Sequence, residues 1–336
     1  MAITAKEIAI LAGVSRGTVD RALKNRSGVN KDTKEKILKI AEQYNYKPNL
    51  IGKALVYSGH YVPVDAILTS LGNPFFDDVK DGLFAAERAY GDYGIKLRLT
   101  ELKGYNAKEL IAALESLDSS VKNVIITPVD NDELREKIEE LTKKGLNIVT
   151  LSGDINAKGI LTHIGCDCYK SGKIAGRLVG LFSEGKARLC IVTGSRLHPG
   201  HRLRVEGVSQ VAKEYSNIEI TDVIENNDDS ETAYRAMKKV LNNKNDIDFV
   251  CITAGGVEGT MRAIKEGGRG IKVCAFDDIP ATKAAMKSGD ISATICQQPY
   301  EQGYNAVKSI YDKVIAKSDV EALQYTQLNI KVDYSL

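Results

Sequence analysis

From Val62 onward, short apolar runs alternate with amphipathic stretches of helical pattern, such as Asp132–Lys144 and Thr232–Asn242, and this alternation restricts the fold more than any other feature. The strand-like runs are Val64–Thr69, Ile95–Thr100, Asn123–Thr127, Ile148–Leu151, Leu189–Thr193, Ile218–Val223, Phe249–Thr253, Lys272–Phe276 and Ala293–Cys296. Strands joined through helices are repeated βαβ units, which predict parallel sheets covered on both faces. About 270 residues of this kind predict an α/β body of two doubly wound lobes.

The first 47 residues have a different, all-α pattern. Thr4 and Glu7 fit a capping box, which predicts a helix that starts at residue 5 or 6 and ends at Gly13. Ser15 can cap a second helix over residues 16–24, and Asn30 a third over residues 31–44. The apolar residues expected to face inward are Ile8, Ala9, Leu11, Ala12, Val19, Ala22, Leu23, Ile37, Ile40, Ala41 and Tyr44. Short helices that meet through a tight turn predict a helix-turn-helix unit.

The charge is distributed unevenly along the chain. Residues 1–60 hold eleven Lys and Arg against five Asp and Glu, a balance of +6, whereas the remaining residues have a balance of −4. A basic head on a slightly acidic body predicts that the head meets a polyanion.

The stretch AKEIAILAGVSRGTVDRALKNRSGVNKDTKEKILKIAEQYNYKPNLIGKAL resembles the head of the lac repressor (LacI/GalR) family without a gap. The resemblance implies that the second helix enters the major groove of double-stranded DNA, with Arg16, Gly17 and Arg21 at base-reading or base-adjacent positions. It implies phosphate contacts at Ser15, Thr18, Asn30 and Thr33.

Two residues of the second helix depart from the family pattern. Gly17 has no side chain where the family often has a base reader, and Asp20 stands where serine is common. The Asp20 carboxylate can accept from cytosine N4 or pair with a neighbouring arginine. We therefore expect an operator unlike the commonest family sites.

Residues 48–61 form the expected hinge helix and linker. The resemblance implies that residues 48–55 fold on operator DNA and that Leu55 wedges between base pairs in the minor groove. The alternative is a linker helix that packs Leu55 internally. Gly52 is a weak helix former, which suits a segment that orders only when bound.

Three stretches of the body, residues 62–336, resemble periplasmic sugar-binding proteins of the ribose-binding type: SLGNPFFDDVKDGLFAAERAYG, HIGCDCYKSGKIAGRL and ATICQQPYEQGYNAV. The second and third match the points where such chains cross between lobes. The resemblance implies an N-terminal lobe of residues 62–164 plus 297–322, and a C-terminal lobe of residues 165–296 plus 323–336.

Ligands of open α/β sheets bind beyond the carboxyl ends of the strands. By position or resemblance, the candidate effector residues there are Asn73, Phe75, Phe76, Ser152, Arg204, Gly255, Asp277 and Gln297. Alternatives remain open: one of the two Phe residues packs in the core, Arg202 takes the place of Arg204 or Arg204 lies on the surface, and Asp277 or Asp278 caps a helix.

The candidate site departs from the sugar-binding proteins at two strand ends. Ser152-Gly153 stands where an Asp-Arg pair is frequent, and Ala254-Gly255-Gly256 replaces the usual Asn-Asp. A different hydrogen-bonding set should prefer a different ligand. The expected class is a sugar, polyol or related small polar molecule.

No cofactor, metal site or enzyme activity is expected. The Gly255–Gly259 turn lacks the spacing of a dinucleotide motif. The histidines of the His198-Pro199-Gly200-His201 segment are expected in a loop at the cleft mouth. Of six cysteines, Cys166 and Cys168 form a C-x-C pair too short for a typical zinc site, and buried reduced thiols are expected.

These features predict a sequence-specific transcriptional repressor that binds a near-palindromic operator as a homodimer. The alternatives are a catabolite-control-type regulator with a phosphorylated carrier protein as corepressor, and a solute-binding protein. The N-terminus lacks the pattern of a secretory signal and no run of about 18 apolar residues occurs, so a cytoplasmic protein without a membrane span is expected.

Overall fold

The computed structural model describes residue 3 and residues 5–23, 27–44, 61–243, 246–268 and 270–333. The head forms α1 (Ala5–Ala12), α2 (Arg16–Leu23) and α3 (Lys31–Gln43). This confirms the three predicted helices. The predictions on Thr4, Leu55 and the hinge segment 48–60 lie outside the described residues.

Two of the predicted helix boundaries in the head have a clear local cause. Gly13 follows α1 with a φ of +72°, a conformation that glycine adopts readily at a helix end. Asn30 caps α3, because its side-chain oxygen accepts a hydrogen bond from the Thr33 amide at 2.8 Å.

The three helices enclose a small apolar core around Ile8, Val19 and Ile37, which are fully buried. The predicted burial of two residues is wrong, because Leu11 and Tyr44 are each 47% exposed. Leu11 lies beside the narrow stripe that α1 turns toward α2 and α3. Tyr44 is the residue that ends α3, so the helical spacing that predicted its burial no longer applies there.

The described residues of the body form two six-stranded sheets. The first has the order β11-β5-β4-β3-β1-β2, from β1 (Val62–Leu68), β2 (Ile95–Glu101), β3 (Asn123–Ile126), β4 (Asn147–Leu151), β5 (Thr162–Gly165) and β11 (Leu323–Tyr325). The second has the order β12-β10-β9-β8-β6-β7, from β6 (Lys186–Thr193), β7 (Asn217–Glu225), β8 (Phe249–Ile252), β9 (Lys272–Phe276), β10 (Ala293–Cys296) and β12 (Asn329–Lys331). The strand pairs are parallel except for β10 with β12.

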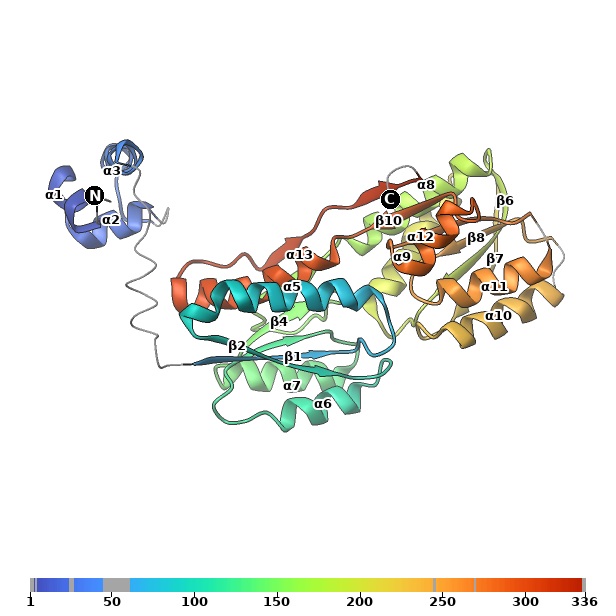
Figure 1. Cartoon of the computed structure of the whole chain (residues 1–336), viewed down its shortest axis with the longest axis horizontal. Coiled ribbons are helices and arrows are strands. Elements are labelled where there is room, and N and C mark those ends of the chain that lie inside the picture. Colours follow the sequence, from blue (N-terminus) through green and yellow to red (C-terminus); the bar gives the residue numbers. More distant parts are fainter. Residues whose placement is uncertain are drawn as a thin grey trace.

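Helices cover both faces of each sheet (Figure 1). In the first lobe, α5 (Phe75–Tyr90) and α13 (Pro299–Tyr311) pack on one face, and α6 (Ala107–Glu115) and α7 (Asp132–Lys143) on the other. In the second, α8 (Cys168–Phe182) and α9 (Pro199–Ala212) lie opposite α10 (Ser230–Asn243), α11 (Val257–Gly267) and α12 (Pro280–Lys287). A 3₁₀ turn, η1 (Gly91–Tyr93), follows α5, and a π turn, η2 (Asp312–Ala316), follows α13. The predicted doubly wound lobes are confirmed.

The nine predicted strands are present, and three strands were missed: β5, β11 and β12. The three-residue strand β11 pairs with β5 in the first sheet, so placing all of residues 323–336 in the C-terminal lobe was wrong. The chain therefore crosses between the sheets three times: after β5, after β10 and between β11 and β12. β11 and β12 are three-residue strands at the sheet edges, where little apolar surface is buried, so their sequences show no strand pattern. β5 lies inside the first sheet, and its buried polar residues Thr162 and His163 interrupt the apolar pattern that marks the other inner strands.

The remaining expectations on composition concern the cysteines and the membrane. All six cysteines are buried and free of disulfides, as predicted. Among the described residues, no helix combines the length and apolar character needed to cross a membrane.

Candidate functional site

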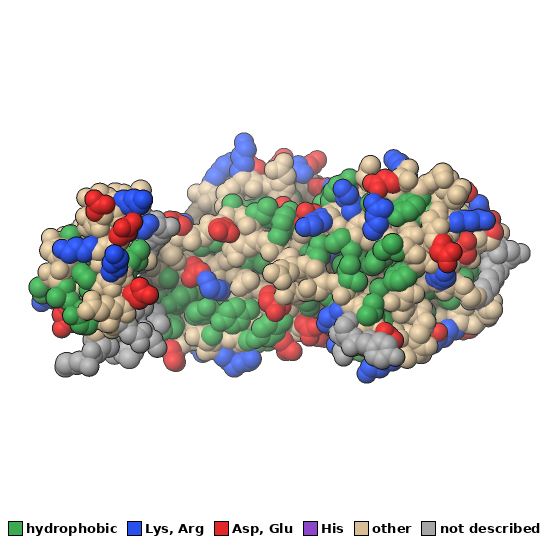
Figure 2. Space-filling view, turned by 90° about the horizontal axis from the view of Figure 1, so that it is seen from above, with side chains coloured by type: hydrophobic (Ala, Val, Ile, Leu, Met, Phe, Trp, Pro, Cys, Tyr) green, Lys and Arg blue, Asp and Glu red, His purple; other side chains and the backbone are tan. Residues whose placement is uncertain are grey.

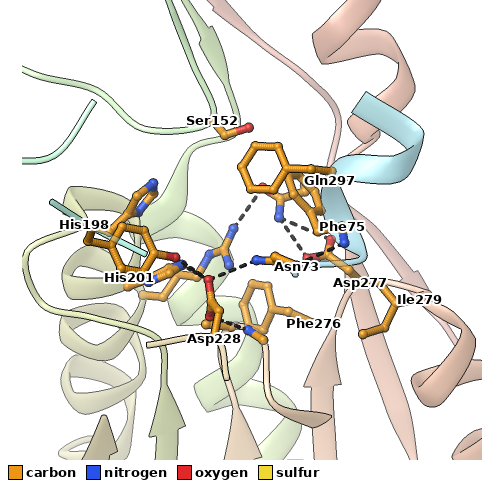
Figure 3. A pocket seen from close by; sticks show the side chains of 15 residues that line it. Asn73, Phe75, Ser152, His198, His201, Asp228, Phe276, Asp277, Ile279 and Gln297 are labelled. Carbon is orange, nitrogen blue, oxygen red and sulfur yellow. Dashed lines mark hydrogen bonds and ion pairs between the residues drawn. The ribbon is translucent and has the colours of Figure 1, made fainter. Parts of the chain in front are cut away.

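A cavity of about 40 Å³ lies between the two lobes, beyond the carboxyl ends of their strands (Figure 3). All eight candidate effector residues line it: Asn73, Phe75, Phe76, Ser152, Arg204, Gly255, Asp277 and Gln297. Seven further residues complete its wall: Tyr105, His198, His201, Asp228, Ala254, Phe276 and Ile279. The structure thus brings together residues that are more than 200 positions apart in the sequence.

The wall of the first lobe is built by the turn after β1. Asn73 accepts a hydrogen bond from the Phe75 amide at 3.1 Å, which fixes the start of α5. The rings of Phe75 and Phe76 meet edge to face with centroids 5.1 Å apart, and both side chains also belong to the core of this lobe. Both aromatic residues therefore combine core packing with a surface toward the cavity.

The guanidinium of Arg204 lines the cavity, and the residue is only 5% exposed. Its Nη1 donates to the Thr253 carbonyl at 2.8 Å and its Nη2 to Gln297 Oε1 at 2.8 Å. The group lies over the Phe276 ring, 4.5 Å from the centroid. Its Nε has no hydrogen-bond partner among the described residues. Arg202, the alternative, instead pairs with Asp130 at 2.8 Å.

Asp277 follows β9 directly and faces Arg204 through Gln297. The Gln297 amide donates to Asp277 Oδ2 at 3.0 Å while its oxygen accepts from Arg204, so the three side chains form one buried chain of hydrogen bonds. Burial raises the pKa of Asp277 to about 7, although Arg204 opposes this shift. Asp277 does not cap α12, because that helix begins after Ile279 without a side-chain cap.

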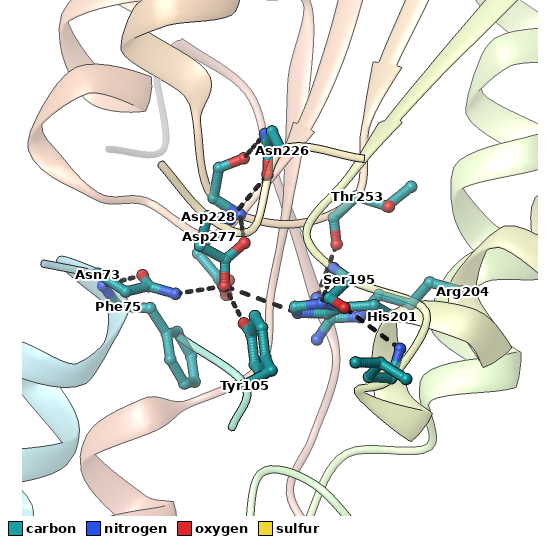
Figure 4. A network of polar contacts seen from close by, with 12 residues as sticks. Asn73, Phe75, Tyr105, Ser195, His201, Arg204, Asn226, Asp228, Thr253 and Asp277 are labelled. Atoms are coloured by element: carbon teal, nitrogen blue, oxygen red, sulfur yellow. Dashed lines mark hydrogen bonds and ion pairs between the residues drawn. The ribbon is translucent and has the colours of Figure 1, made fainter. Parts of the chain in front are cut away.

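A carboxylate of the second lobe, Asp228, contacts the first lobe directly (Figure 4). Its Oδ2 accepts from Asn73 Nδ2 at 2.9 Å and from the Tyr105 hydroxyl, and its Oδ1 accepts from the Gly255 amide at 2.8 Å. Burial and this carboxylate raise the pKa of Tyr105 well above its usual value. We call the contacts of Asp228 with Asn73 and Tyr105 the lobe bridge.

Gly255 has a steric reason to be glycine. A Cβ atom at this position would lie 2.9 Å from Asp228 Cβ and Oδ1, closer than real Cβ contacts allow. The absence of a side chain lets the backbone amide of Gly255 reach the Asp228 carboxylate.

The two histidines expected in a loop at the cleft mouth are instead buried at the start of α9. Pro199 fits the first turn of that helix because its missing N–H would have no partner there. The two imidazole rings lie 4.3 Å apart, and Tyr105 packs edge-on against both. Burial lowers the pKa of His201 to about 3 and that of His198 well below its usual value, so both are neutral at pH 7. His198 Nδ1 has no hydrogen-bond partner among the described residues.

A second, larger cavity of about 560 Å³ lies on the other side of the lobe bridge. Asn73, Tyr105, Asp228 and Ile279 line both cavities. The lobe bridge therefore separates the small inner cavity from a wider outer one.

Ser152 was predicted to line the site, whereas Tyr105 and Asp228 were not. Ser152 donates to Gln302 Oε1 at 2.9 Å, so its hydroxyl is engaged within its own lobe. Tyr105 and Asp228 were missed, although each follows a strand end by three or four residues, at Glu101 and Glu225 respectively. Their distance beyond the strands hid them, whereas a search of the full loops after each strand could have found them.

In the head, the predicted DNA-contacting residues lie at the start and along the outer side of α2 and at the start of α3. Arg16, Gly17, Asp20 and Arg21 are exposed, and Thr18 is half-buried. Ser15 caps α2 by accepting from the Thr18 amide at 3.1 Å, and Arg21 donates to Thr18 Oγ1 at 3.4 Å. A Cβ at Gly17 would meet only Ser15 Oγ at 3.7 Å, so the bare surface there is not required by packing.

The chain matches two families along its length. Residues 4–49 match the bacterial regulatory proteins of the lacI family, and residues 64–318 match the periplasmic binding protein domain. The first match contains the head and the second covers both lobes.

Similar proteins include both importers and repressors. The ribose import binding protein RbsB of Salmonella typhimurium is 26% identical over 269 residues, covering 79% of this chain and 89% of that protein. The probable HTH-type transcriptional repressor ExuR of Bacillus subtilis is 28% identical over 288 residues, covering 82% of each. The ribose operon repressor of Lactococcus lactis is 23% identical over 327 residues, covering 95% of this chain and 94% of that protein.

Solved structures agree with the fold of the body. The crystal structure of GanP, a glucose-galactose binding protein from Geobacillus stearothermophilus, has a TM-score of 0.76 and 25% identity, covering 82% of this chain and 99% of that one. The chain belongs to the periplasmic binding protein domain family over its body, and it has at its N-terminus a head of the kind found in the bacterial regulatory proteins of the lacI family.

Proposed function

We propose that this protein is a cytoplasmic transcriptional repressor without enzyme activity, whose affinity for a near-palindromic operator is controlled by a sugar or related small polar effector bound between the lobes. The observation that carries the effector is the convergence of eight ligand-type residues from both lobes on one buried cavity. The repressors among its relatives support the regulatory role.

Two unpartnered polar atoms in the cavity wall support a polar ligand. Arg204 Nε and His198 Nδ1 are buried without a hydrogen-bond partner, and such groups are rare because each costs free energy. Hydroxyl groups of a ligand can satisfy both atoms, and the rings of Phe75 and Phe76 offer an apolar face beside them. This combination of donors, acceptors and rings suits a sugar or polyol.

We propose that the protein acts as a homodimer, because two heads are needed to read two half-sites. Exposed apolar side chains on α13, β11 and β12 support contact with another protein surface: Tyr300, Leu323, Tyr325 and Ile330. Figure 2 shows apolar side chains gathered among scattered charges on one face of the body.

The effector acts through its different affinity for the two arrangements of the lobes. A catabolite-control-type regulator would respond instead to a phosphorylated carrier protein. A function as a solute-binding protein would not require the DNA-binding head. The buried polar groups of the cavity favour the small-molecule effector.

A thermal-shift screen of the full chain against sugars, sugar acids and polyols tests the effector. A ligand that binds the folded state at 100 times its Kd should raise stability by about 2.7 kcal/mol, which appears as a higher Tm. The Arg204→Met variant, which keeps most of the side-chain volume, should lose the shift for the same ligand. If a phosphorylated carrier protein alone changes operator affinity and no small molecule raises the Tm, the effector proposal is wrong.

The Arg21→Ala variant tests the reading of DNA by α2. If Arg21 reads a base, operator affinity should fall by about 1–3 kcal/mol with relaxed specificity at one position. The measurement is binding to the operator and to single-base variants of it, at one fixed salt concentration. The Lys39→Ala variant of α3 removes the same charge outside α2 and is the control. An equal loss on all sequences would make Arg21 a phosphate contact.

A further inference from the structure

The C-x-C pair lies where the chain first crosses between the lobes, directly after β5 and at the start of α8. Cys166 Sγ lies 3.7 Å from Cys168 Sγ, and both thiols are free and buried. Neither thiol is needed for the hydrogen bonds that hold the crossover, since Asp167 caps α8 by accepting from the Lys170 amide at 2.8 Å. The proximity of the two sulfur atoms therefore calls for its own explanation.

The pair is in contact with the effector cavity. Cys166 Sγ donates to Gln297 Oε1 at 3.2 Å, and Arg204 Nη2 lies 4.0 Å from the same sulfur. Gln297 and Arg204 are two members of the buried chain that ends at Asp277. A change in the chemical state of Cys166 is thus felt by residues that line the cavity.

The surroundings favour a thiolate at Cys168. Its sulfur sits at the first residue of α8, where the helix N-terminus favours negative charge, and the Arg204 cation lies nearby. The contact with Cys166, together with Arg204, lowers the pKa of Cys168 below its usual value, against the effects of burial and of Asp167. Burial raises the pKa of Tyr325 on β11, and the charges of Asp167 and of the two cysteines add to this effect. Cys168 packs beneath the first turn of α9, near Gly200.

A second cysteine pair in the same lobe provides a comparison. Cys251 and Cys274 are register partners on the adjacent strands β8 and β9, and both are buried. The hydrogen bond with Cys274, followed by burial and the neighbouring Cys190, raises the pKa of Cys251 well above its usual value. Two neighbouring cysteines alone therefore do not make a reactive pair, and Arg204 and the helix terminus distinguish Cys166 and Cys168.

We propose that Cys166 and Cys168 are a modification site, at which a small peroxide reversibly oxidises the two thiols to an intrachain disulfide. The Cys168 thiolate attacks one peroxide oxygen and the O–O bond breaks, which leaves a sulfenic acid and a hydroxide that takes up a proton to become water. The Cys166 sulfur then attacks the sulfenic sulfur, loses its proton, and releases the second water. In sum, two thiols and one hydrogen peroxide give one disulfide and two waters.

The reaction has a direct effect on the cavity. The two sulfur atoms must approach from 3.7 Å to a bond length of about 2.05 Å. Gln297 then loses the thiol donor of Cys166, and Arg204 loses the negative charge of the Cys168 thiolate. The coupling of this site to effector binding rests on the proposed function, whereas the oxidation itself does not.

Peptide mapping of the full chain tests the oxidation without an effector. Trypsin places both cysteines in the one peptide of residues 159–170, and each other cysteine in a peptide of its own. The protein is treated with hydrogen peroxide, and the remaining thiols are alkylated. This peptide should then be two hydrogen atoms lighter than its dithiol form and carry no alkyl group. Reduction should restore the two hydrogen atoms. The peptides of Cys251 and Cys274 should stay alkylated. A fully alkylated peptide 159–170 would overturn the proposal.

The alkylation rate of the untreated protein provides the second test. In the peptide 159–170 the rate should rise with pH through a midpoint below that of an ordinary thiol, because only the thiolate reacts. The Cys166→Ser variant should move this midpoint upward and form no intrachain disulfide in that peptide. A midpoint at the ordinary thiol value in the wild-type protein would contradict the activated thiolate even if the variant fails to fold.

Hydrogen–deuterium exchange tests the link to the cavity. Backbone amides around Gln297 should exchange faster in the oxidised protein. The reason is that the hydrogen-bonded side chains from Arg204 to Asp277 lose their contact with the Cys166 sulfur. Exchange that is unchanged there, together with a formed disulfide, would separate the modification from the cavity and overturn the coupling.

Discussion

The Asp277→Ala variant is expected to bind operator DNA as the wild-type protein does and to lose its response to the effector. Asp277 is the buried end of the chain formed with Gln297 and Arg204, and its carboxylate lines the cavity. Because the pKa of Asp277 is raised to about 7, its hydrogen bond to the effector lies between a neutral and a charged one. Its loss costs about 0.5–3 kcal/mol, which corresponds to roughly a 2- to 150-fold loss of effector affinity. The carboxylate lies far from the head along the chain, so operator affinity without effector should stay unchanged.

Operator binding with and without the effector found by the thermal-shift screen measures this response. Asp278→Ala is the matched control, because the neighbouring carboxylate pairs with Lys331 at 2.7 Å and does not line the cavity. Asp278→Ala should keep the full response. A retained response in Asp277→Ala would remove this residue from the site, whereas lost operator binding in both variants would indicate a general folding defect.

The sequence predicted the body well where burial leaves a pattern. Strands such as β8 are apolar throughout because both faces of the sheet are covered. The apolar runs in the sequence therefore coincide with the observed strands. The same physics explains the success at the cavity, since residues that follow a strand directly, such as Asp277, must lie at the edge where ligands bind.

Several failures in the body share one physical cause, which is that the interactions concerned link distant segments. Tyr105 and Asp228 lie 123 positions apart and meet only because the two lobes face each other. The burial of His198 and His201 depends on the Tyr105 ring of the other lobe, which the local pattern does not show. Likewise, β11 is recognised only through its pairing with β5.

The size of the cavity connects these distant contacts to ligand entry. A volume of about 40 Å³ is small beside the roughly 300–1,000 Å³ of ordinary small-molecule pockets. A monosaccharide needs more room, so the lobes must separate or the side chains must move before it enters. The lobe bridge stands between the inner cavity and the outer one, so we expect the effector to replace its contacts.

The Asp228→Ala variant is therefore expected to shift the lobes toward an open arrangement. It removes the hydrogen bonds from Asn73 and Tyr105 across the cleft. Each bond to the carboxylate contributes about 1.5–3 kcal/mol in the closed form, and water replaces part of this in the open form. The ratio of open to closed molecules should thus rise at least about tenfold. The contact of Arg202 with Asp130 remains and keeps the closed form accessible.

Small-angle X-ray scattering of the full chain measures the opening as a larger radius of gyration. Asp246→Ala is the control, because that carboxylate pairs with Arg188 at 2.6 Å within the second lobe and should leave the scattering unchanged. Tyr105→Phe removes one bond of the bridge and should give an intermediate shift. Because the Asp228 carboxylate holds the lobes together without a ligand, the variant should also bind the effector with a faster association rate. Scattering identical to that of the wild-type protein would show that the lobe bridge does not hold the closed form.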